Sequence, residues 1–201
     1  GPNVHEEMEL EPLTDYSIFK AECEKILSEF QSENFTTTTI RPATVCGYSP
    51  RQRLDVVVNI LTNLAYHKRE ISIFGGDQLR PNIHIADMVE AYMVLLRAPK
   101  EKIAGKIYNA GYENQPVKKI AETVKNVVGE DVKLVTSHSD DNRSYHISSN
   151  KIKTELGFVA KHTIRDAVEG LCEAFDKKLL PNSLEDQMYF NIKRMQNINL
   201  S

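Results

Sequence analysis

The sequence has few cysteines, no basic run and no long hydrophobic run. Its three cysteines are widely spaced and include no Cys-x-x-Cys pair, which argues against a disulfide framework and against a zinc site, so we expect no bound metal. A net charge of -3, without a lysine- and arginine-rich arm, argues against nucleic acid as a partner. The apolar stretches are too short to span a membrane and the start is acidic, so we expect no membrane association and a reducing, cytoplasmic setting.

The sequence also lacks the closely spaced glycines that a dinucleotide-binding loop requires. The nine glycines are scattered, and the adjacent pair Gly75-Gly76 has no third partner. No stretch therefore has the spaced glycines that, after a first strand, place a pyrophosphate at a helix N-terminus. The main phosphate loop of a dinucleotide site is not among these residues.

What the chain does have is alternating helical and extended patterns. At 201 residues it can bury one good core or form two small lobes. Apolar spacing predicts helices over residues 16–31, 56–66, 86–96, 117–128, 150–156 and 164–180. It predicts strands over residues 36–40, which we expect to be buried, and 71–74, 83–85, 106–109 and 132–135. This alternation indicates an α/β architecture, and the polar tail over residues 181–201 fits neither pattern.

Tyr16 and Lys20 lie four residues apart in the first predicted helix. Residues i and i+4 share a helix face, so both side chains can reach one bound molecule, and the ammonium stabilises the phenolate formed when a tyrosine gives up its proton. The spacing alone is weak evidence, because Tyr189 and Lys193 repeat it in the same chain. On spacing alone, a surface helix with a solvated lysine is the more common explanation.

The segments that follow change this assessment. In order they are Thr39-Ile-Arg-Pro-Ala-Thr-Val-Cys-Gly47, Ile73-Phe-Gly-Gly-Asp-Gln-Leu-Arg80, Asn82-Ile-His-Ile-Ala-Asp87 and Ile107-Tyr-Asn-Ala-Gly111. This order resembles the extended short-chain dehydrogenase/reductase family, specifically its NAD-dependent nucleotide-sugar epimerases and dehydratases. The resemblance runs from about Asn3 to at least Phe158. Each segment is a weak signal, whereas their common order is a strong one.

The resemblance implies the rear part of a Rossmann-like doubly wound sheet plus a small mixed α/β substrate-binding lobe. Residues 1–49 would be a remnant of the dinucleotide-binding domain, with the Tyr-x-x-x-Lys helix and one strand. Residues 50–201 would form mainly the substrate-binding lobe, interleaved with returning Rossmann elements near residues 83–111.

The resemblance also implies roles for individual residues near the cofactor. Tyr16 would be the general acid/base acting on a sugar hydroxyl, and Lys20 would bind the nicotinamide ribose. The segment holding Pro42, Thr44 and Val45 would pass its backbone beside the nicotinamide of NAD. The catalytic serine or threonine, the acidic ribose contact and the phosphate loop of the family would precede residue 1.

Four arginines are implied as substrate contacts. Arg80 and Arg143 match the two family arginines that face the nucleotide diphosphate, and a guanidinium suits bidentate phosphate binding. Arg51 and Arg53 lie in the loop that closes over the substrate in this family, although ordinary solvated arginines are about as common there.

The sequence also departs from the family pattern beside Arg80. Pro81 and Asn82 replace the usual aspartate and aromatic residue, which puts the local substrate contacts in doubt. For His84, inside an apolar run, a packed or hydrogen-bonded histidine is the more common role than a catalytic one.

Together these features predict the C-terminal portion of an NAD-dependent nucleotide-sugar epimerase/dehydratase that supplies the Tyr/Lys pair for transient sugar oxidation. We expect it to be inactive alone, so whether this chain by itself is an enzyme stays open. A homodimer through the Tyr16–Lys20 helix is expected from the family. The alternative is a non-catalytic nucleotide-sugar-binding or protein-interaction module derived from the same fold.

Overall fold

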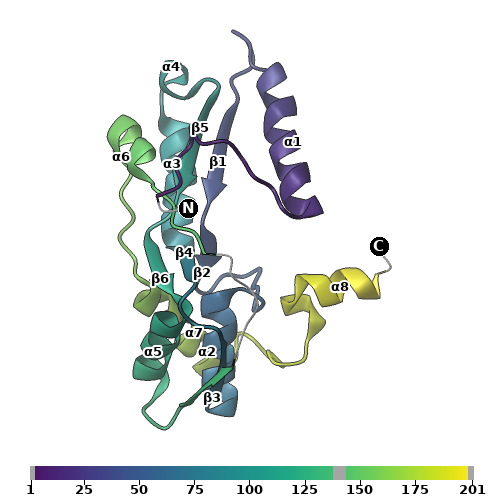
Figure 1. The fold of residues 1–201 in the computed structure, drawn as a ribbon, viewed down its shortest axis with the longest axis vertical. Coiled ribbons are helices and arrows are strands. Elements are labelled where there is room, and N and C mark those ends of the chain that lie inside the picture. Colours follow the sequence, from purple (N-terminus) through teal and green to yellow (C-terminus); the bar gives the residue numbers. More distant parts are fainter. Residues whose placement is uncertain (1–2, 138–143, 199–201) are drawn as a thin grey trace.

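The computed structural model describes residues 3–137 and 144–198, which form a mixed α/β fold (Figure 1). Its helices are α1 (Asp15–Glu29), α2 (Val57–Lys68), α3 (Ile85–Arg97), α4 (Lys100–Ile103), α5 (Val117–Val128), α6 (Asn150–Leu156), α7 (Ile164–Asp176), the 3-10 helix η1 (Gln187–Tyr189) and α8 (Asn191–Asn197). Its strands are β1 (Thr38–Pro42), β2 (Thr44–Cys46), β3 (Glu70–Phe74), β4 (Leu79–His84), β5 (Lys106–Ala110), β6 (Glu113–Pro116) and β7 (Lys133–Ser137).

The strands pair mostly in parallel, as their helical connections require. β1 lies parallel to β5, β2 to β4 and β3 to β7, while β4 and β6 are antiparallel. The amide of Ala43, between β1 and β2, donates to the carbonyl of Ala110 over 2.7 Å. β1 and β2 therefore form one nearly continuous extended segment, which pairs with β5 along its first part and with β4 along its second.

Three groups of buried apolar residues hold these elements together. The first lies among α2, α5, α7 and β3 and includes Val58, Ile71, Ile120, Val124 and Val168. The second joins β4, β5, α3 and α6 and includes Ile83, Met88, Ala91, Tyr108 and Ile152. The third contains Leu54, Leu171, Phe175 and Leu180, with Tyr189 and Phe190 packed against it.

Two sequence predictions need correction. The strand expected to be buried over residues 36–40 is β1, whose residues are half-buried, with Pro42 exposed. The reason is that β1 pairs on one side only, with β5, among the described strands. The helix predicted over residues 164–180 ends at Asp176, because Lys178 takes a left-handed φ of 56° and turns Leu180 back into the third core.

Helix α1 lies beside β1 at one side of the molecule (Figure 1). Thr14 and Ser17 form a capping box at its start, which satisfies amides that the first helical turn leaves without partners. None of its fifteen residues is buried, and Phe19, Ile26 and Phe30 are more than half exposed. An ion pair between Arg41 of β1 and Glu24, with contacts of 2.6 to 3.1 Å, joins the helix to the sheet.

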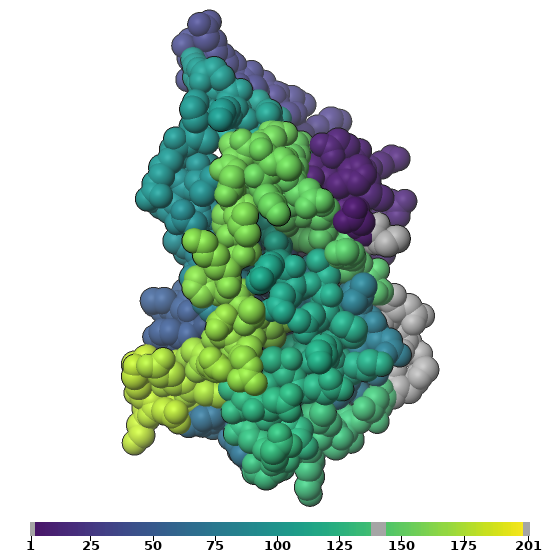
Figure 2. Space-filling model, turned by 90° about the vertical axis from the view of Figure 1, so that its left-hand side faces the viewer, coloured from purple at the N-terminus to yellow at the C-terminus, as the bar shows by residue number. Residues whose placement is uncertain are grey.

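Both ends of the described chain pack against distant segments. Val4 forms a parallel bridge with Ile147, and the buried Glu6 carboxylate accepts the amide of Asn109 over 2.7 Å. Figure 2 accordingly shows the purple N-terminal segment against the green region around α6. At the other end the chain runs back along α2 before α8 projects from the body (Figure 1). In the part of the chain that the structure describes, no helix combines the length and apolar character needed to cross a membrane.

Candidate functional site

Tyr16 and Lys20 both lie on the solvent side of α1. Tyr16 is 75% exposed and Lys20 is also exposed. Among the described residues, neither side chain has a hydrogen-bond or ion-pair partner. The sequence prediction that they share one helix with i, i+4 spacing is confirmed, and both polar groups are available to a ligand on that face.

The predicted cofactor-contacting residues follow α1 on β1 and β2. Pro42 ends β1, and Thr44 lies opposite Asn82 of β4. Val45 packs against the second core, and both Thr44 and Val45 are half-buried. The positive-φ glycine after it, Gly47, lies against His84, because a Cβ there would meet the histidine Nε2 at 3.0 Å. Glycine at this position therefore leaves room for the His84 ring, and its amide donates to Asn59.

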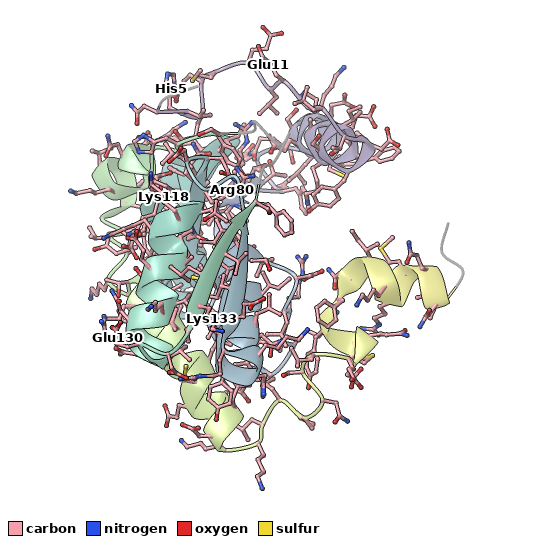
Figure 3. The ribbon with its side chains drawn as sticks, turned by 60° about the horizontal axis from the view of Figure 1, so that its bottom comes forward. His5, Glu11, Arg80, Lys118, Glu130 and Lys133 are labelled. Atoms are coloured by element: carbon pink, nitrogen blue, oxygen red, sulfur yellow. The ribbon has the colours of Figure 1, made fainter. Side chains whose placement is uncertain are left out.

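Arg80 is half-buried near the start of β4. It lies near the N-terminal end of α5, close to Lys118 in the first turn of that helix, and far from Glu130, which follows the C-terminal end (Figure 3). Its Nη1 donates to the carbonyl of Leu79, and its own carbonyl accepts the Asn82 amide over 2.8 Å. Arg143, predicted as the second phosphate contact, lies outside the described residues.

Arg51 and Arg53 lie on the loop between β2 and α2, and both are exposed. The amide of Gln52 donates to the carbonyls of Gly47 and Arg53, and Asn59 of α2 binds both the Gly47 amide and the Arg53 carbonyl. Because these two amides are buried and their bonds close the loop on itself, the backbone between the two arginines is held firmly.

The loop also contacts the C-terminal tail, which sequence reasoning could not place. The amide of Leu54 donates to the carbonyl of Tyr189 over 2.9 Å, and Asp55 accepts the amide of Asn191 over 2.9 Å. Asp55 binds Arg53 at the same time, over 2.9 Å. Partial burial by itself would raise the pKa of Asp55, but the hydrogen bonds from Arg53 and Asn191 outweigh it and hold the pKa below its usual value.

A second group of ionisable residues surrounds His84. Its Nδ1 accepts the amide of Ala86 and so caps α3, and its ring stacks on His162 at 4.9 Å between centroids. The buried Asp87 accepts the amides of Lys161 and His162 and contacts the His162 ring at 2.8 Å. Burial, followed by the charge of His162, lowers the pKa of His84. The hydrogen-bonded role predicted for His84 agrees with this geometry.

A hollow of about 280 Å³ lies elsewhere, between the end of β5 and α6. It is lined by residues that include Tyr112, Asn114, His146, Ser149 and Lys153. None of the predicted site residues that the structure describes lines it, and neither Arg51 nor Arg53 is among its lining residues.

Comparison with known families decides the identity of the fold. The model of the NAD dependent epimerase/dehydratase family matches residues 1–111. The chain belongs to this family. The matched part contains α1 with Tyr16 and Lys20, the β1–β2 segment, the arginine loop and Arg80, which is the order of motifs expected from the sequence.

Curated and solved relatives agree with this assignment. A putative UDP-arabinose 4-epimerase of Arabidopsis thaliana is 26% identical over 80% of this chain and 44% of its own length. The UDP-glucose 4-epimerase of Thermotoga maritima, solved with UDP-glucose, is 26% identical with a TM-score of 0.73, over 84% of this chain and 55% of that one. The UDP-glucuronic acid 4-epimerase of Bacillus cereus, solved with UDP-glucuronic acid and NAD, has a TM-score of 0.76 at 22% identity, over 88% of this chain and 57% of that one. The chain thus spans about half the length of the relatives it matches.

Proposed function

We infer that this chain supplies the substrate-binding surface and the Tyr16–Lys20 pair of an NAD-dependent nucleotide-sugar epimerase or dehydratase. Tyr16 takes the proton of a sugar hydroxyl as that carbon is oxidised, and Lys20 binds the nicotinamide ribose and favours the tyrosine anion. NAD, when bound, supplies the hydride acceptor. Arg80, Arg143 and the loop that carries Arg51 and Arg53 form the binding surface for the diphosphate of the nucleotide sugar.

The observation that supports this proposal most is the exposure of Tyr16 and Lys20 on α1, within the part of the chain that matches the family. Two side chains one turn apart have no partner among the described residues, in a chain whose first 111 residues match the family. The ion pair of Glu24 with Arg41 fixes the helix, while Tyr16 and Lys20 stay exposed. Exposure alone also fits a solvated surface helix, so it is the family match over these residues that favours a catalytic role.

The division into two parts is also a proposal. Residues 1–49, with the strands and helix returning near residues 83–111, would belong to the dinucleotide-binding domain, and most of residues 50–201 to the substrate-binding lobe. The second core, around Tyr108 and Ile83, and the first core, around Val58 and Ile120, support this division because they group the elements in the same way.

We propose further that the 201 residues alone do not turn over a nucleotide sugar. The contacts that the chain offers to NAD are limited to Tyr16, Lys20 and the stretch of Pro42, Thr44 and Val45. These fit the nicotinamide end of the cofactor, whereas the amide of Gly47, the positive-φ glycine beside them, is already bonded to Asn59. A polypeptide that supplies the adenosine-phosphate cradle would restore turnover.

Turnover tests the role of Tyr16. The chain is mixed with NAD and UDP-glucose, with and without a polypeptide carrying the glycine-rich half of a family member, and the sugar products are followed by NMR. We expect no turnover by the chain alone. In the active mixture, Tyr16→Phe should reduce the rate at least 100-fold, the scale of general acid/base catalysis. Tyr92→Phe, at another exposed tyrosine, should leave it unchanged. Activity of the isolated chain would overturn the claim of inactivity, and an active Tyr16→Phe variant would remove Tyr16 from the mechanism.

The non-catalytic alternative rests on the same surface. Phe19 and Ile26 on α1 and Phe30 at its C-cap are exposed apolar side chains that suit contact with another polypeptide, which supports a homodimer or a partner protein. If nucleotide sugars bind but no added polypeptide restores turnover, the binding module is the better description.

A further inference from the structure

The two arginines of the β2–α2 loop have different electrostatic surroundings. Arg53 donates from Nε to the carboxylate of Asp55 over 2.9 Å, so its charge is neutralised by a neighbour. Arg51 donates to three oxygens, which are the carbonyl of Gln52 at 3.1 Å, the carbonyl of Met188 at 3.4 Å and the side-chain amide oxygen of Asn191 at 3.4 Å. All three are neutral. Within the described part of the chain, the positive charge of Arg51 is therefore held in place without being compensated.

Arg51 also keeps donors free for a ligand. A guanidinium has five N–H groups, and the three acceptors use only its two terminal nitrogens. The two contacts to the tail, at 3.4 Å, are long, so they direct the guanidinium toward one side without holding its donors tightly. The remaining N–H groups match the fork geometry with which arginine binds phosphate oxygens in pairs.

The acceptors from the tail are fixed independently of Arg51. Tyr189 and Phe190 pack on the third core, the carbonyl of Tyr189 accepts the amide of Leu54, and the amide of Asn191 donates to Asp55. Farther back, Ser183 donates to Asn63 of α2 over 2.7 Å and contacts His67 at 3.0 Å. Asn191 therefore lies at a well-anchored point of the tail, and an arginine oriented in this way loses less rotamer freedom when it binds an anion.

We propose that Arg51 is the diphosphate-binding arginine of this loop, and that the C-terminal tail orients it through Met188 and Asn191. Arg53 is then the structural partner of Asp55. Asn191 is a positioning residue, because it acts on the ligand through Arg51. The proposal rests on the proposed function and deepens it, since the ligand class is the diphosphate of a nucleoside diphosphate sugar.

The test is a pair of matched substitutions in α8. Asn191→Asp puts a carboxylate of the same shape against Arg51 and neutralises it. The helix dipole favours a negative charge at this position, whereas the Asp55 carboxylate, which accepts the amide of residue 191, opposes it, so unchanged urea unfolding is required of the variant. Asn197→Asp makes the same charge change at the exposed end of the same helix. Binding of UDP-glucose, UDP and inorganic pyrophosphate to the full chain is measured by calorimetry at two salt concentrations, with urea unfolding as the control for folding.

We expect Asn191→Asp to weaken binding of all three ligands about tenfold, the scale of one charge-assisted hydrogen bond, and to flatten the dependence on salt. Asn197→Asp should bind within about twofold of the unmodified chain, because an exposed charge at that distance is screened. Arg51→Lys, which keeps the charge and loses the fork, should recover only part of the affinity that Arg51→Gln removes.

The outcomes separate the two proposals. If UDP-glucose binds equally well to both aspartate variants, the role of Arg51 and the tail is wrong while the proposed function stands. If pyrophosphate binds and responds to Asn191→Asp but no nucleotide sugar binds, the anion site is correct and the proposed function is wrong. If no ligand binds to the unmodified chain, both proposals fail.

Discussion

At the scale of single residues, some polar side chains hold the fold together through hydrogen bonds, and others have no partner among the described residues. Glu24, Asp55 and Asp87 each bind two or more donors and fix an element or a loop. Tyr16 and Lys20, by contrast, have no such partners among the described residues. Tyr16 and Lys20 can therefore contact a ligand without first breaking a contact within the described part of the chain.

His84 predicts how the stability of the chain changes with pH. Burial, and then the charge of His162, lowers the pKa of His84 in the folded chain below its ordinary value of 6.5, while the carboxylates of Asp87 and Asp166 act in the opposite direction. Below about pH 7 the unfolded chain therefore binds more protons than the folded chain, and the free energy of unfolding falls as the pH is lowered through 6.5.

The measurement is urea unfolding between about pH 8 and pH 5.5. His84→Asn keeps an oxygen that can cap α3 but removes the titration, so its stability should fall less steeply toward low pH. Some slope should remain, because burial also lowers the pKa of His67. Identical slopes for the variant and the unmodified chain would contradict this assignment.

At the scale of elements, α1 is attached to the body of the protein by few contacts. It has no buried residue, and its strongest contact is the ion pair of Glu24 with Arg41, in which both side chains are 20% exposed. A helix with so little burial opens locally at a small free-energy cost. Its order therefore depends on this pair and on the capping box at its start.

Glu24→Gln should loosen α1 without unfolding the rest. We expect the amides of α1 to exchange hydrogen several times faster, while the free energy of global unfolding changes by less than about 3 kcal/mol, the upper scale of a hydrogen bond to a charged group. Glu22→Gln, an exposed position on the same helix, is the control and should leave the exchange unchanged. Equal exchange rates in the two variants would show that the pair does not anchor the helix.

The elements also show which parts of the fold the sequence can predict. α5 was predicted to the residue, because Val117, Ile120, Ala121 and Val124 form one buried face at helical spacing. β6 was missed because Glu113–Pro116 is polar and short, and it becomes a strand only through its pairing with β4. A strand of this kind is defined by its partner and not by its own residues.

At the scale of the whole molecule, the site depends on contacts between distant parts of the chain. The family could be predicted because Tyr16 and Lys20, the β1–β2 segment and Arg80 occur in family order, and the family model matches this stretch. The role of the tail could not, since the contacts of Leu54 with Tyr189 and of Asp55 with Asn191 join residues more than a hundred positions apart. No local pattern in residues 181–201 indicates the loop they meet.

The most direct test of the central claim is a calorimetric titration of the chain with UDP-, GDP- and dTDP-glucose and, separately, with NAD. The account predicts saturable binding of at least one nucleotide sugar and much weaker binding of NAD. Arg80→Gln should weaken the sugar nucleotide about tenfold or more, and Arg165→Gln, which breaks an exposed pair with Glu169 on α7, should not. Absence of binding for all three nucleotide sugars, or equal effects of the two arginine substitutions, would contradict it.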